Sequence, residues 1–112
     1  MKQYHALYIS DSIREKRLQI LKKIKYNKFQ RDKFLIVLTK NEKNHLEFFD
    51  AMMLLQKTIV KEDLFLVGLA DGYSGALELV QKITEEVYAE TGGVDIRGYL
   101  LKKQQEFEES NV

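Results

Sequence analysis

The stretch that decides the fold is Leu64-Phe65-Leu66-Val67-Gly68-Leu69-Ala70, which contains no charged or hydrogen-bonding side chain. Residues 34–38 form a similar apolar run, and residues 4–9 form a weaker one. Uninterrupted apolar strands are typical of sheets that are covered on both faces, as in parallel α/β proteins. We therefore expect a small, three-stranded and mainly parallel sheet.

Helical periodicity lies between and after these strands. Ser12 and Glu15 have the spacing of a capping box at the start of a first helix. Apolar residues predict a second helix over 41–59, a third over 74–91 that ends at Gly92, and a fourth from Asp95. The predicted order is β-α-β-α-β-α-α, in one α/β domain over residues 1–107 with a frayed tail over 108–112.

Two strand orders agree with this pattern. Order 2-1-3 is doubly wound and places helices on both faces of the sheet. Order 1-2-3 places every crossover helix on one face, so that the last helix or a second subunit must cover the other. We expect 2-1-3, although the first strand is the least apolar of the three.

Composition excludes several classes of protein. The chain has 112 residues, of which 45% are hydrophobic, so it can bury a core of its own. It has no Cys, and its two histidines, His5 and His45, lie far apart, so we predict no disulfide and no metal site built on Cys or His. We also predict no cofactor. No apolar run approaches the roughly 18 residues of a membrane span. We expect a cytoplasmic protein with no membrane partner.

Charge is divided unevenly along the chain. Residues 1–45 hold 12 Lys/Arg against 4 Asp/Glu, whereas residues 46–112 hold 6 against 13. Such asymmetry suggests a charged partner, and a basic helix surface can neutralise phosphates. In order 2-1-3, however, the basic first helix and the acidic third helix share one side of the sheet and partly neutralise each other. We therefore rank nucleic acid last among the partners. The basic residues of this region are Arg14, Lys16, Arg17, Lys22, Lys23, Lys25, Lys28, Arg31 and Lys33.

The predicted second helix has an unusually wide apolar surface. A helix that covers one face of a sheet needs a stripe of roughly 100° or somewhat more. Here the apolar side chains cover more than half of the helix circumference, and either the last helix or a second subunit must bury the surplus. We expect a homodimer whose interface includes Phe48, Met52, Leu55 and Ile59.

The segments that follow the strands form the candidate ligand site. In a parallel sheet they meet at one edge, and each opens a helix whose amino end favours an anion. Asp11 and Asp71 could also act as paired carboxylates for a divalent ion or for acid–base chemistry. The competing interpretation is that these side chains only cap their own helices. We predict no catalytic residue. The candidate ligand-binding residues are Asp11, Ser12, Asn41, Asp71 and Ser74.

A family resemblance rests on the stretches Leu7-Tyr8-Ile9-Ser10-Asp11-Ser12 and Leu66-Val67-Gly68-Leu69-Ala70-Asp71-Gly72-Tyr73, followed by residues 76–80. In these stretches the chain resembles a family of short bacterial α/β proteins with no assigned activity. The resemblance implies an α/β fold and carries no site residue or cofactor.

Three functions follow from these observations. The first is a homodimeric interaction or regulatory module without catalytic activity. The second is binding of a small molecule, phosphate or metal ion at the strand ends. The third is weak nucleic-acid binding through the first helix.

Overall fold

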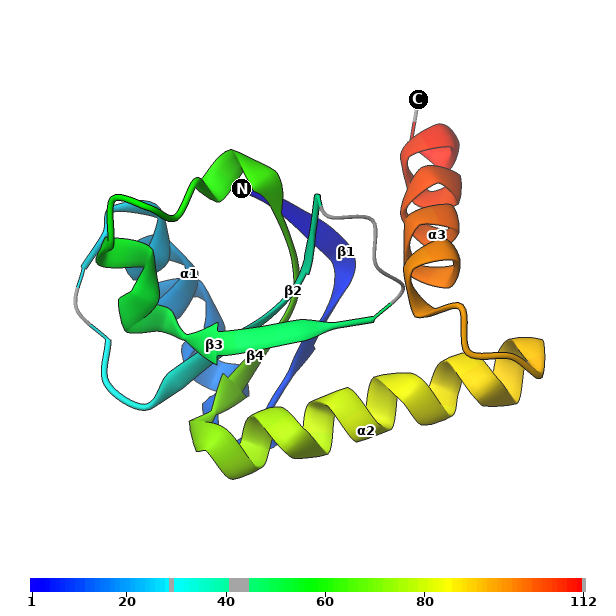
Figure 1. Ribbon diagram of the computed structural model, residues 1–112, viewed down its shortest axis with the longest axis horizontal. Coiled ribbons are helices and arrows are strands. Elements are labelled where there is room, and N and C mark those ends of the chain that lie inside the picture. The colour runs from blue at the N-terminus through cyan, green and yellow to red at the C-terminus, as the bar shows by residue number, and fades with distance from the viewer. Residues whose placement is uncertain (29, 41–44, 112) are drawn as a thin grey trace.

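The computed structural model describes residues 1–28, 30–40 and 45–111, and it confirms the α/β class. The three predicted strands are present, and a fourth strand lies between the second and the third. The four strands form a single mixed sheet in the order β1-β4-β2-β3 (Figure 1). The strands are β1 (Lys2–Ile9), β2 (Lys33–Thr39), β3 (Glu47–Asp50) and β4 (Leu64–Asp71).

Both predicted strand orders are wrong. The last strand, β4, lies between β1 and β2; it pairs in parallel with β1 and antiparallel with β2. β3 then pairs antiparallel with β2 at the far edge. A parallel arrangement of β2 and β4 would need a long crossover, usually helical. The chain contains no such helix in the described residues between them, and this is why the mainly parallel sheet does not form.

The predicted second helix over 41–59 is absent from its described part, residues 45–59. Those residues form β3 and the 3₁₀ helix η2 (Ala51–Leu55), and η3 (Lys61–Asp63) follows before β4. The apolar surface predicted for this helix is wide because the segment includes a strand, in which neighbouring residues face opposite sides of the sheet. Phe48 packs against the core on the α2 side, and Phe49 packs against the core on the other side.

Helices cover both faces of the sheet. One core lies against α2 and α3 and includes Ile36, Val67, Ile83 and Leu100. The other lies against α1 and includes Ile20 and other buried residues of β2 and β4. Figure 1 shows α1 apart from α2 and α3. The helices are η1 (Asp11–Lys16), α1 (Arg17–Lys25), α2 (Gly72–Thr91) and α3 (Ile96–Ser110).

The structure confirms some of the predicted helix ends and corrects one. Gly92 ends α2 in the left-handed conformation with φ 72°, as predicted, and Asp95 caps α3 by accepting a hydrogen bond from the Gly98 N–H. The predicted capping box at the start of the first helix is wrong, because Ser12 lies within η1 and does not cap a helix. Helix α3 extends into the predicted tail as far as Ser110.

Candidate functional site

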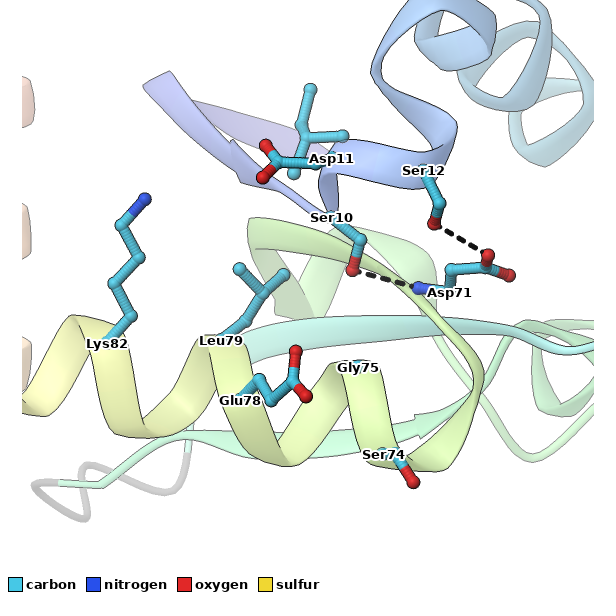
Figure 2. A pocket seen from close by; sticks show the side chains of 10 residues that line it. Ser10, Asp11, Ser12, Asp71, Ser74, Gly75, Glu78, Leu79 and Lys82 are labelled. Carbon is cyan, nitrogen blue, oxygen red and sulfur yellow. Dashed lines mark hydrogen bonds between the residues drawn. The ribbon is translucent and has the colours of Figure 1, made fainter.

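The parallel strands β1 and β4 end side by side, and four polar side chains meet there. The Asp71 backbone N–H donates to Ser10 Oγ over 3.0 Å. Ser12 Oγ donates to Asp71 Oδ2 over 2.7 Å, and Lys33 Nζ lies 3.2 Å from Asp71 Oδ1. Figure 2 shows the two serine hydroxyls directed at Asp71. The Asp71 carboxylate is therefore fixed by two donors from different segments.

These contacts set the charge of Asp71. The hydrogen bond from Ser12, followed by that from Lys33, holds the pKa of the Asp71 carboxyl below its usual range. Asp71 stands at the amino end of α2 without accepting a side-chain capping bond. The interpretation that the strand-end residues only cap their own helices thus fails for both Ser12 and Asp71.

A cavity of about 470 Å³, here called the acidic cavity, opens beside this group. Four of the five predicted ligand residues line it, together with Glu78 and Lys82: they are Asp11, Ser12, Asp71 and Ser74. The Ser74 hydroxyl points away from Ser10 and Asp71 (Figure 2). Three carboxylates against one lysine make this cavity a poor place for phosphate, contrary to the anion pocket expected there.

The expected pair of carboxylates does not form. Asp71 is bonded to Ser12 and Lys33, whereas Asp11 is paired with Arg14 at 3.0 Å. Within the described part of the chain, no group of three or more His, Cys, Asp or Glu side chains could hold a metal ion. Asp71 and Asp11 therefore each bind partners of their own, although both line the acidic cavity.

Strand β2 ends at the opposite edge of the sheet from this group. Thr39 pairs with Leu64, the first residue of β4, because β2 runs antiparallel to β4. The prediction that three strand-end loops converge is therefore wrong, and Asn41 itself lies outside the described residues. The same antiparallel register pairs Lys33 with Asp71. The start of β2, and not its end, contributes to the site.

A second cavity of about 470 Å³, here called the basic cavity, lies on the α1 side of the Ser12–Asp71 bond. Gln30 is buried at its wall, and its amide donates to the Ile20 carbonyl over 3.3 Å, which holds the incoming segment of β2 against α1. Cations from both segments line this cavity: Lys16, Lys23, Arg31 and Lys33.

From the sequence, these residues are expected on a charged helix surface and in the segment after it, and no pattern there predicts the basic cavity. Lys16 and Lys23 form no ion pair with any side chain in the described ranges. The chain returns from α1 to β2 through Asn27 and Asp32, which both adopt φ 56°. These residue types tolerate the left-handed conformation, and they were the available signal for a tight return.

The predicted dimer residues do not form one stripe. Phe48 packs on the α2 side of the sheet, and Ile59 packs on the α1 side. Met52 is half-buried, and Leu55 is 45% exposed. The described residues therefore do not form the helical surface on which the homodimer was predicted.

None of the helices formed by the described residues is long and apolar enough to span a membrane. Comparisons with protein-family models, curated proteins and solved structures found no match to this chain.

Proposed function

We propose that the protein binds a phosphate-bearing ligand in the basic cavity and does not transform it. The observation that carries this proposal is the meeting of Lys16, Lys23, Arg31 and Lys33 around one cavity, against the single carboxylate of Asp71. Closely spaced cations repel one another, and an anion between them relieves that repulsion. Phosphate oxygens accept several charge-assisted hydrogen bonds at once.

The Ser12–Asp71–Lys33 group supports this function by holding one cation in place. Lys33 is largely buried, with its side chain 23% exposed, and its ammonium is bound to Asp71. Lys16 and Lys23 are exposed and have long flexible stems. One positioned lysine and two adaptable lysines suit a ligand with phosphate groups at more than one point.

Calorimetric titration with tripolyphosphate tests the proposal. The charge reversal Lys16→Glu/Lys23→Glu removes two cations from the cavity, and each charge-assisted bond is worth about 1.5–3 kcal/mol. We expect affinity to fall at least tenfold. The matched control Lys82→Glu/Lys102→Glu makes the same charge change on α2 and α3, where both side chains are exposed, and it leaves affinity nearly unchanged. Equal loss in both variants, or no binding by the unaltered chain at low salt, contradicts the proposal.

A homodimer is a second proposal, now supported by a different surface. The rings of Phe34, Phe48 and Tyr73 contact one another, with centroids 5.7 to 6.3 Å apart. Tyr73 is 59% exposed, and Leu77, one turn later on α2, is 46% exposed. Sedimentation of the unaltered chain and of Tyr73→Ser/Leu77→Ser tests this proposal: a dimer that the substitutions dissociate supports it, and a monomer at high micromolar concentration contradicts it.

A further inference from the structure

The fold places a basic segment of the chain on one face of the sheet and an acidic segment on the other. Residues 11–33, which include α1, hold nine Lys/Arg against three Asp/Glu. Residues 71–110, which include α2 and α3, hold four against nine. The expectation that the basic and acidic helices share one side is wrong, because α1 packs on one face and α2 and α3 pack on the other. The basic face is therefore not neutralised by the acidic helices.

A third cavity continues this basic face across α1. It has a volume of about 650 Å³ and is lined in part by Lys22, Lys25, Tyr26 and Lys61; we call it the lysine–tyrosine cavity. Lys61 is held there by a 2.7 Å hydrogen bond to the Ile24 carbonyl, at the end of α1. The two cavities meet at adjacent residues, since Lys23 lines the basic cavity and Lys22 lines the lysine–tyrosine cavity.

Tyr26 adds an aromatic surface to the cationic one. Its side chain is 57% exposed, and Lys25 Nζ lies 5.7 Å from the ring centroid. An exposed ring among lysines is the arrangement with which proteins bind single-stranded nucleic acid, because bases stack on the ring while cations follow the phosphates. A small phosphate compound would fill one cavity and leave the other unused.

We infer that the phosphate-bearing ligand is a single-stranded nucleic acid, which crosses α1 from the basic cavity to the lysine–tyrosine cavity. This inference rests on the proposed function and specifies its ligand. The backbone phosphates lie over Lys16, Lys22 and Lys23, and one base stacks on Tyr26. A duplex would supply the same phosphates without an unstacked base, so the exposed ring favours the single strand.

Fluorescence anisotropy with labelled DNA and RNA single strands of about 12 nucleotides tests the inference. The logarithm of the binding constant should fall with the logarithm of salt concentration, by about 0.7 for each phosphate neutralised. Lys22→Gln/Lys23→Gln should reduce that slope by about 1.4 because it removes two such contacts. The matched pair Lys82→Gln/Lys102→Gln should leave the slope unchanged.

The stacking contact has its own readout. Tyr26→Ala should weaken binding of the single strand at least about fivefold, whereas Tyr26→Phe should retain most of the affinity. Tyr88→Ala is the matched control, because Tyr88 is 61% exposed on α2. Circular dichroism of each variant verifies that the fold is kept.

The outcomes separate the two proposals. Binding of tripolyphosphate without binding of either oligonucleotide overturns the nucleic-acid inference and leaves the proposed function standing. Equal affinity for a duplex of the same length, or binding of the single strand that is insensitive to Tyr26→Ala, also overturns it, because charge alone would then explain the affinity. Failure of every anion to bind overturns both.

Discussion

Ser12 and Asp71, which are 59 residues apart in the sequence, are joined by a hydrogen bond of 2.7 Å from Ser12 Oγ to Asp71 Oδ2. The bond connects η1 to the junction of β4 and α2, and it forms the wall between the acidic and basic cavities. Both side chains therefore connect distant segments of the fold, and neither caps its own helix.

Removing this hydrogen bond should loosen the basic cavity. Ser12→Ala leaves Asp71 with Lys33 as its remaining side-chain partner, and we expect a loss of roughly 0.5–1 kcal/mol in the free energy of unfolding. Tripolyphosphate affinity should fall as Lys33 gains mobility. Urea unfolding and calorimetry measure the two effects. Ser74→Ala is the control, because Ser74 lines the acidic cavity but points away from Asp71; an equal effect there would contradict the role of Ser12.

The same group predicts a dependence of stability on acid. The folded protein lowers the pKa of Asp71 from its reference value of 3.8, so its stabilising contribution is present above about pH 4 and is lost as the pH falls further. Asp71→Asn should therefore be less stable than the unaltered chain at pH 6. The difference should shrink toward pH 2, and unfolding curves at both pH values measure it. A difference that is independent of pH would contradict this role of the carboxylate.

Two tyrosines predict the alkaline limit of stability. Burial raises the pKa of Tyr4 to about 12, and burial together with the hydrogen bond to Glu86 raises the pKa of Tyr8 further. The folded chain then holds protons that the unfolded chain releases near pH 10, so stability is full below pH 10 and falls above it. Tyrosinate absorbance during an alkaline titration should show Tyr4 and Tyr8 ionising only as the chain unfolds. Tyr8→Phe should leave one such tyrosine, and an unchanged late phase in that variant would refute the assignment.

The left-handed residue at the end of α2 predicts a paired result. Gly92 has φ 72° and nothing within 4 Å of an added Cβ, so Gly92→Ala should cost about 1 kcal/mol through backbone strain alone. Gly93 has no positive φ, and the atom nearest to a Cβ added there would lie 3.7 Å from it. Gly93→Ala should be nearly neutral. Thermal unfolding compares the two variants, and equal losses would contradict the assigned conformation.

The apolar runs predicted the strands but not their directions. Residues such as Leu35, Ile36 and Val67 are buried in a covered strand whether its neighbour is parallel or antiparallel. Phe48 and Phe49 widened the apolar surface of a supposed helix because a covered strand also buries both of its sides. Direction and order depend on how segments far apart pair, which periodicity within one segment does not contain.

Only part of the candidate site was predictable from the sequence. Asp11, Ser12 and Asp71 lie together because β1 and β4 are parallel neighbours, as the sequence led us to expect. Lys33 reaches Asp71 only because β2 runs antiparallel to β4, and no pattern in the sequence signals that direction. The basic cavity therefore required the structure.

The most direct test of the proposed function is a titration of the isotope-labelled chain with tripolyphosphate, followed by nuclear magnetic resonance. The account predicts saturable shifts of the backbone amides around the basic cavity, at Lys16, Lys23, Arg31 and Lys33, with α3 unaffected. Shifts confined to α2 and α3, or no shifts at low salt, would show that the basic cavity is not a phosphate site.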